Sequence, residues 1–301
     1  MTRRATQAYA MVAASYLIIG LSGTLVTWAS APASALLALR FGIACVAIGA
    51  VMVARKRRPT GVLRRDVWPK LLLMGLFDAT ALLLYFVAIR ETTVAIGTIF
   101  LFIQPVWIAV LAPRLIHSAT ERVVYIAIGL ALAGLAVILF PAFSGGGIHA
   151  SALGLLAGLV SGFSYAGFAL VVKDVSKRVD SGTMVLAECS LDCLFLLPLA
   201  LWQTVGVGYS LTSRDLIVAL VLGLLCTAVA YSLWMEGVRW VRMQHSAVLG
   251  FLAPVAAPIY ALILLGQGIT AWTAAGGVLI LAAGILVVLR GEPDVESEPP
   301  V

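Results

Sequence analysis

Residues 85–114 read YFVAIRETTVAIGTIFLFIQPVWIAVLAPR, and the features of this stretch return later in the chain. One hydrophobic run ends at Arg90, a short polar turn follows, and a second hydrophobic run carries Pro105 near its middle. Residues 234–267 read WMEGVRWVRMQHSAVLGFLAPVAAPIYALILLGQ, with the same features in the same order. The corresponding residues Trp234, Arg239 and Pro254 each lie 149 positions after Tyr85, Arg90 and Pro105. A constant offset of about half the chain length predicts a duplicated unit.

The composition of the 301-residue chain predicts a membrane protein. Hydrophobic residues make up 62% of it and charged residues 11%, against roughly 45–50% and about 25% in soluble domains. A soluble fold of this size has too little interior for so much apolar surface, whereas a bilayer accommodates it. The four cysteines all fall inside hydrophobic runs, and we interpret them as core residues rather than disulfides or metal ligands: Cys45, Cys189, Cys193 and Cys226.

Ten hydrophobic segments follow one another, each close to the ~20 residues that cross about 30 Å of hydrocarbon. Short connections favour helices running up and down, and the alternating strands of a closed barrel are not seen. The first segment is longer than the core of a signal peptide, so we retain it as a transmembrane helix. The expected fold is an all-α membrane protein with spans at 6–28, 32–54, 68–89, 93–113, 122–141, 151–172, 183–204, 215–237, 245–265 and 270–289.

The basic residues predict the orientation of these spans. With the N-terminus inside, 17 of the 20 Lys and Arg residues lie on the inner side, as the positive-inside rule requires. Both termini are then cytoplasmic, in the inner membrane of a bacterium. The net charge of +6 therefore indicates orientation and contact with anionic lipid, and no nucleic-acid partner. The acidic, proline-rich tail 291–301 is expected to be disordered.

The duplication divides the chain into two units of five helices, at 6–141 and 151–290. Because five is an odd number, the two units enter the membrane from opposite sides and are inverted relative to one another. Inverted repeats are a common plan of secondary transporters, in which exchange of conformation between the halves turns the binding site from one side to the other.

Several short motifs resemble the drug/metabolite transporter superfamily, and the two units resemble EamA-type repeats of its ten-helix branch. The motifs are Leu39–Phe41 in the second span, Ala88–Arg90 before the fourth, and Gln104–Val106 within it. The resemblance implies a central cavity lined by helices one to four and six to nine. It also implies export of amino acids or other metabolites, or movement of nucleotide sugars. A glutamate common in such repeats after the fourth helix is missing, since residues 114–117 are RLIH and the second unit has Gln267.

Two charged residues, Arg40 and Asp78, lie near the bilayer midplane. Each is nine or ten residues from the end of its span, which at 1.5 Å per residue reaches the centre. Intramembrane charges are costly and face the bundle interior. Two interpretations remain open: Arg40 holds an anionic group of the substrate while Asp78 competes for it or carries a proton, or the two form a structural bridge.

Glu188 and Asp192 are four residues apart in the seventh span and share one helix face. Two carboxylates so close together in a low dielectric repel one another, which suits a site that exchanges protons. The alternative is that Glu188 lies near the cytoplasmic end, in water or beside a lysine of the 173–178 loop, and that Asp192 alone is deep.

Pro105 and Pro254 occupy matching positions in the two units and predict loosened helices there, because proline removes one backbone hydrogen bond. Pro258 adds a second bend. Broken backbone at membrane depth lines protein or a wet cavity, so these hinges indicate a central site to which Gln104 would contribute. The aromatic residues expected to face the cavity are Tyr16, Tyr85, Trp107, Phe163, Tyr165, Tyr231 and Trp234. Ordinary helix packing is the alternative for each.

No catalytic motif was found in the sequence, which predicts no enzyme, cofactor or metal site. The expected function is a secondary active transporter that exports a small metabolite by alternating access with proton coupling. Its expected partners are a small-molecule substrate and the lipid bilayer. A passive channel or a lipid-translocating protein is the alternative. Oligomeric state does not follow from the sequence.

Overall fold

The computed structural model describes residues 3–56, 65–92, 94–144, 151–206, 208–266 and 268–291, all helices and their connections without a strand. Gln267, the predicted disordered tail from residue 292 onward and the basic residues at 57–64 lie outside these ranges. The helices are α1 (Arg3–Val26), α2 (Ala33–Ala54), α3 (Trp68–Glu91), α4 (Val94–Leu101), α5 (Gln104–Leu115), α6 (Arg122–Ser144), α7 (Ala152–Val175), α8 (Ser181–Val205), α9 (Ser213–Gly223), η1 (Leu224–Val229), α10 (Ala230–Gly237), α11 (Met243–Leu249), α12 (Leu252–Leu265) and α13 (Ala271–Arg290).

These helices form ten segments that are long and apolar enough to cross a bilayer, so the predicted all-α membrane fold is confirmed. Seven of the spans are single helices. The fourth consists of α4 and α5, the ninth of α11 and α12, and the eighth of α9, the π-helix η1 and α10.

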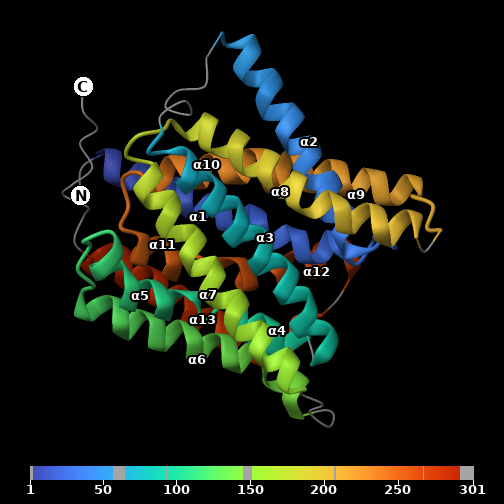
Figure 1. Cartoon of the computed structure of the whole chain (residues 1–301). Coiled ribbons are helices and arrows are strands. Elements are labelled where there is room, and N and C mark those ends of the chain that lie inside the picture. Colours follow the sequence, from blue (N-terminus) through green and yellow to red (C-terminus); the bar gives the residue numbers. More distant parts are fainter. Residues whose placement is uncertain are drawn as a thin grey trace.

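The helix neighbours are those of two halves related by a pseudo-two-fold axis. Corresponding spans meet in the helix pairs α2–α8 and α6–α13, and the fourth and ninth spans meet through α5 and α11. Other contacts between the halves come in equivalent pairs. Helix α3 packs on α7 as α10 packs on α1, and α4 and α5 pack on α7 as α12 packs on α1. In Figure 1, α6 and α13 lie at one edge of the bundle and α2 and α8 at the opposite edge. This is the arrangement expected of inverted five-helix repeats.

The beginning of α1 and the end of α13 lie at the same end of the bundle. Tyr9 of α1 contacts His245 at the start of α11. A Cβ placed on Gly291 would lie 2.6 Å from the ring of the same histidine. An even number of spans requires both ends of the chain on one side, and the structure agrees.

The fourth and ninth spans, which have a break between two α-helices, each pack against a glycine of the other half. A Cβ on Gly162 of α7 would lie 2.3 Å from the carbonyl oxygen of Phe100, just before the break in the fourth span. A Cβ on Gly20 of α1 would lie 2.7 Å from the carbonyl oxygen of Ala253, just after the break in the ninth. Helices that approach so closely need small residues at the contact, so these glycines allow the broken backbone to reach the interior of the bundle.

Candidate functional site

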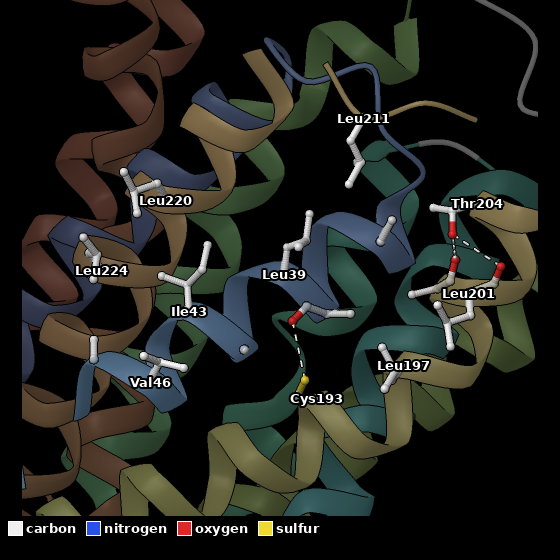
Figure 2. A pocket seen from close by; sticks show the side chains of 15 residues that line it. Leu39, Ile43, Val46, Cys193, Leu197, Leu201, Thr204, Leu211, Leu220 and Leu224 are labelled. Carbon is white, nitrogen blue, oxygen red and sulfur yellow. Dashed lines mark hydrogen bonds between the residues drawn. The ribbon is translucent and has the colours of Figure 1, made fainter. Parts of the chain in front are cut away.

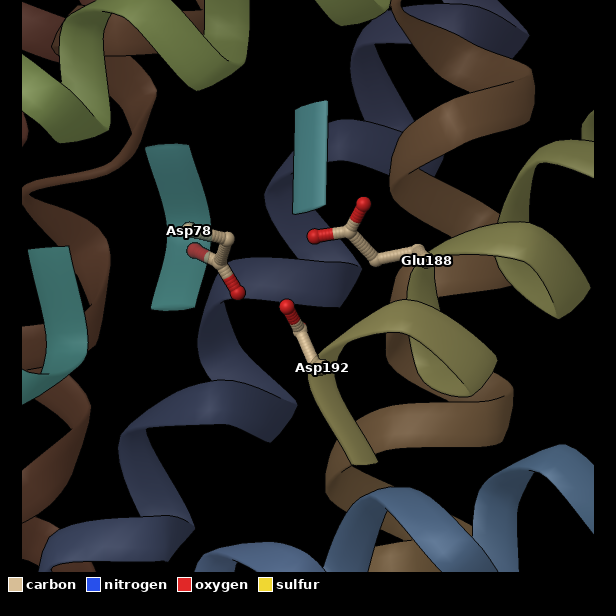
Figure 3. Close-up of side chains that lie close together, drawn as sticks. All are labelled: Asp78, Glu188 and Asp192. Carbon is tan, nitrogen blue, oxygen red and sulfur yellow. The ribbon is translucent and has the colours of Figure 1, made fainter. Parts of the chain in front are cut away.

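Three acidic side chains meet in the interior of the bundle, Asp78 from α3 and Glu188 and Asp192 from α8. All three residues are completely buried. Figure 3 shows the three carboxyl groups directed toward one another, and one oxygen of each lies within 4.8 Å of the others. The i, i+4 spacing places Glu188 and Asp192 on the face of α8 that packs against α3. We refer to these three residues as the acidic cluster.

The six carboxyl oxygens of the acidic cluster have no hydrogen-bond partner among the described residues. Burial of an ionised carboxylate without a partner is highly unfavourable, and several negative charges at this separation repel one another strongly in a low dielectric. The cluster is therefore stable only when it holds protons or a cation.

Arg40 of α2 forms no ion pair with the acidic cluster. Its Nε donates to Thr227 Oγ1 at 2.5 Å, and its Nη2 lies 3.5 Å from the carbonyl oxygen of Cys226. The guanidinium carbon lies 5.3 Å from the ring centroid of Phe41 and 5.9 Å from that of Tyr231, which is within the range of cation–π attraction. The structural Arg40–Asp78 bridge, one of the two interpretations from the sequence, is not formed.

The partners of Arg40 are presented by a π-helical turn that the sequence did not reveal. η1 interrupts the eighth span, and the Thr227 hydroxyl donates to the carbonyl of Leu222, five residues earlier. Its oxygen remains free to accept from Arg40. π-turns inside α-helices are frequently found at functional sites. Hydrophobic periodicity gives no signal for one extra residue in a turn, but the 149-residue offset relates Thr227 to Asp78 and could have drawn attention to it.

The expectation that Glu188 meets water or a lysine near the cytoplasmic end is wrong. The Glu188 residue has no exposed surface and joins Asp192 and Asp78 in the interior. Lys173, the lysine of the 173–178 loop nearest the membrane, instead donates to the backbone carbonyls of Val238 and Val241. Both acidic residues of α8 are therefore deep.

Several of the predicted aromatic residues form one wall beside the acidic cluster and Arg40. Tyr165 stacks on Phe168 at 5.8 Å between ring centroids, and Phe168 stacks on Trp234 at 5.6 Å. Trp234 Nε1 donates to Ser246 Oγ at 3.0 Å. The Tyr231 ring meets Arg40, and both Tyr165 and Tyr231 are within electrostatic range of Asp78.

Tyr16 of α1 is buried and lies at the break of the ninth span, where a Cβ on Gly250 would be 3.4 Å from its ring. Gln104, at the start of α5, is buried beside the break of the fourth span. Each of these two residues therefore lies beside the break of one of the two broken spans. Their role in substrate binding stays a prediction.

The other predicted aromatic residues have contacts away from the cluster. The Tyr85 hydroxyl lies 3.5 Å from Thr98 Oγ1 of α4. Trp107 packs edge-on against Phe163 of α7 at 5.5 Å. The prediction that Phe163 faces the cavity is wrong, because it is 42% exposed and continues the outward stripe formed by Leu156 and Val160.

The breaks in the fourth and ninth spans lie just before the matched prolines. Helix α4 ends at Leu101 and α5 begins at Gln104, next to Pro105. Helix α11 ends at Leu249 and α12 begins at Leu252, two residues before Pro254. Pro258 lies inside the continuous helix α12 and produces no break. Hinge motion at these positions stays a prediction.

An apolar crevice of about 680 Å³ lies on the outside of the bundle between α2, α8 and α9. Figure 2 shows Leu39, Ile43 and Val46 of α2 between leucines of α8 and the eighth span. Its lining is almost entirely aliphatic, and several of these residues are exposed. The surface suits the acyl chain of a bilayer lipid, and hydrophobic periodicity alone does not indicate it.

Comparison with known proteins gives consistent results. The sequence matches the EamA-like transporter family over residues 6–140 and again over residues 152–289. It is 28% identical over 224 residues to the uncharacterized transporter YwfM of Bacillus subtilis (strain 168), covering 73% of each chain. It is 29% identical over 230 residues to an uncharacterized transporter of Archaeoglobus fulgidus, covering 75% of this chain and 79% of that one.

A solved crystal structure of a protein superposes on the fold with a TM-score of 0.78, over 94% of this chain and 97% of the other. The two sequences are 18% identical, a level at which the similarity shows the fold alone.

Proposed function

We propose that this protein, which belongs to the EamA-like transporter family, exports a small metabolite in exchange for protons that bind at the acidic cluster. Membership of the family makes the chain a multi-pass membrane transporter, consistent with its ten apolar spans.

The observation that carries the proposal is the set of six unpartnered carboxyl oxygens of Asp78, Glu188 and Asp192. A structural role would pair these groups with a base or with backbone amides, because an unpaired buried charge is costly. A proton-coupled carrier instead needs acidic groups that gain and lose protons when they face opposite sides of the membrane. The cluster fulfils that requirement.

The arrangement of the helices supports alternating access. The two halves contribute different parts of the site, since Asp78 belongs to the first unit and Glu188 and Asp192 to the second. Rocking of one half against the other would expose the acidic cluster to one side at a time. The breaks at residues 102–103 and 250–251 provide loosened backbone in equivalent helices of both halves.

The direction of transport rests on the distribution of basic residues. With both termini in the cytoplasm of a bacterium, the positive-inside rule is satisfied. Protons moving inward through the acidic cluster would then drive the substrate outward. Arg40 would hold an anionic group of the substrate, as the intermediate exposure of this residue and its neutral hydrogen-bond partners allow.

The apolar crevice favours a second candidate function, the translocation of a lipid. A polar headgroup near Arg40 with an acyl chain in the crevice would fit such an activity. The two functions differ in substrate, so an excess of a soluble metabolite would compete with the first and leave the second unchanged.

Uptake into proteoliposomes tests the proposal. Vesicles containing the purified protein are given labelled amino-acid or nucleotide-sugar mixtures, with and without a pH gradient. We expect saturable transport that the gradient accelerates in the wild type and no longer accelerates in Asp192→Asn. Asp174→Asn is the matched control, because Asp174 pairs with Lys70 at the end of α7. Non-saturable flux, or a gradient effect that survives in Asp192→Asn, would overturn the proposal.

A further inference from the structure

We infer that the acidic cluster binds the ammonium group of an organic amine, so that the exported substrate is a small organic cation. This inference rests on the proposed function and adds the chemical class of its substrate. Three independent features of the described residues support it: the spacing of the carboxyl oxygens, the balance of charge, and the aromatic wall.

The spacing of the three carboxyl groups can accommodate a single ammonium group. An ammonium nitrogen donates three hydrogen bonds in tetrahedral directions, so acceptors about 2.8 Å away stand roughly 4.6 Å from one another. One oxygen each of Asp78, Glu188 and Asp192 lies within 4.8 Å of the others. The three groups come from two helices and point inward (Figure 3), which leaves every oxygen available to a donor.

A metal ion is the competing ligand of this cluster, because the same three oxygens could also hold one. Mg²⁺ holds its oxygen ligands at 2.0–2.1 Å, which brings neighbouring ligands to about 3 Å from one another. We assign the cluster to an ammonium donor because of the charge balance and the aromatic wall, and we treat metal binding as an outcome that the experiment can detect.

The balance of charge favours a substrate with net positive charge. Three ionised carboxylates against the single charge of Arg40 leave an excess of two negative charges. A buried site crosses the membrane most easily when it is close to neutral. Two protons provide that neutrality in one direction, and an organic cation with two positive charges that displaces them provides it in the other.

Aromatic rings beside the cluster add to the attraction for a cation. The Tyr231 ring already lies 5.9 Å from the guanidinium carbon of Arg40, and the stacked pair of Tyr165 and Phe168 continues the wall. Organic ammonium groups bind well over such rings once they are desolvated. The same wall offers the apolar stem of an amine a surface to pack against.

Isothermal titration calorimetry with 1,4-diaminobutane tests the inference directly. The full-length protein in detergent is titrated at pH 6, 7 and 8, in two buffers with different heats of ionisation. We expect binding that releases protons and an affinity that rises about tenfold per pH unit for each proton released. Glutarate and 1,4-butanediol, of similar length but without an amine, are expected not to bind.

The pH dependence of diamine binding could also come from other titratable groups near the cluster, and these need to be excluded. They are Arg40 from α2, Tyr165 from α7, Tyr231 from α10 and Cys189 from α8. Arginine and tyrosine ordinarily keep their charge state between pH 6 and 8. The pH series is repeated with Cys189→Ser, which removes the remaining group and is expected to give the same result.

Isosteric amides identify the binding residues. Asp78→Asn, Glu188→Gln and Asp192→Asn are each expected to weaken diamine binding by about tenfold or more, the loss of one charge-assisted hydrogen bond. The control Asp174→Asn should bind as the wild type does. Removal of an unpaired buried charge does not endanger folding, and a monodisperse gel-filtration peak for each variant verifies this.

Each result decides between the two proposals. Absence of diamine binding at every pH, binding unchanged by the amide variants, or competition by Na⁺ or Ca²⁺ without binding of amines would overturn the inference. If proton-driven uptake of an uncharged metabolite is observed all the same, the proposed function stands alone. If the diamine binds and no gradient drives its transport, the ammonium site stands and the proposed function fails.

Discussion

Asp78 and Thr227 occupy equivalent positions in the two halves of this protein, 149 residues apart. Each faces a residue of the second helix of the other half. Asp78 meets Glu188 and Asp192 of α8, whereas Thr227 meets Arg40 of α2. The residue equivalent to Arg40 is Cys189, next to Glu188.

The two equivalent contacts therefore carry opposite charge. One half-site presents three carboxyl groups without partners, and the other presents a guanidinium whose partners are a hydroxyl and a backbone carbonyl. A symmetric backbone supports alternating access, while side chains of opposite charge give the two ends of a bound substrate different partners. The two halves therefore share their backbone arrangement but differ in the charge of the side chains at the equivalent contacts.

A carboxylate at position 227 would remove the difference in charge between the two half-sites, and we expect it to have the largest effect on transport. In Thr227→Asp the new carboxylate would pair with Arg40 and remain buried. Because separating a buried ion pair costs about 3–5 kcal/mol, we expect the rate of proteoliposome uptake to fall at least 100-fold. Thr227→Ser keeps the hydroxyl and should transport normally. Wild-type transport by Thr227→Asp would show that Arg40 need not be released from Thr227.

A second pair of equivalent residues allows the two ends of the bundle to be compared. Asp215, at the start of α9, is completely buried and accepts hydrogen bonds from the backbone amides of Ser30 and Ala31. Tyr209 and Thr212 also donate to it. Asp66, 149 residues earlier, pairs with Arg178 in a contact in which both side chains are more than a third exposed.

The Asp215 network should matter more to stability. Asp215→Ala leaves the partly buried backbone amides of Ser30 and Ala31 without this partner and removes a helix cap, which together cost about 2–4 kcal/mol. We expect the midpoint of thermal unfolding in detergent to fall by several degrees. An unchanged midpoint would indicate that water replaces the carboxylate.

The ionisation of Tyr209, which lies in the connection before α9, provides a measure of the hydrogen bonds around Asp215. Its hydroxyl donates to the Asp215 carboxylate, and this raises the pKa of Tyr209 above its ordinary value. The stability gained from this bond is present below about pH 10 and is lost as the pH rises further. In Asp215→Ala an absorbance titration should show one tyrosine ionising at lower pH than in the wild type. Tyr209→Phe provides the control without that signal.

Removal of the Thr227 hydroxyl should have a smaller effect. Thr227→Val keeps the shape of the side chain but takes away the acceptor for Arg40 Nε, a charge-assisted hydrogen bond worth about 1.5–3 kcal/mol. Part of the loss is recovered through the Cys226 carbonyl, so we expect uptake to fall about tenfold or less. A decrease as large as that in Thr227→Asp would contradict the distinction between a lost acceptor and a fixed ion pair.

The smallest effect is expected at the exposed counterpart of Asp215. Asp66→Ala removes a solvent-exposed ion pair with Arg178, and such pairs contribute about 0–1 kcal/mol. The unfolding midpoint should change by no more than about a degree or two. A decrease equal to that of Asp215→Ala would show that the two ends of the bundle are held equally.

The membrane class, the ten spans and the duplicated unit could all be predicted from the sequence, because each depends on local hydrophobicity or on a constant offset between residues. The sequence also placed Asp78 and Asp192 deep within the membrane, since depth follows from distance along a helix, but it left the depth of Glu188 open. The breaks near Pro105 and Pro254 were predictable for a similar reason, as proline acts on its own helix.

Which of these residues meet depends on the packing of the helices and could not be predicted from the sequence. The choice of Thr227 as the partner of Arg40 depends on a π-turn and on the packing of α2 against the eighth span, neither of which hydrophobic periodicity encodes. The position of Phe163 on the outer surface depends on the rotation of α7. A buried charge must face some interior, but its neighbours are set by how helices from two halves of the chain pack together, and that is a property of the whole bundle.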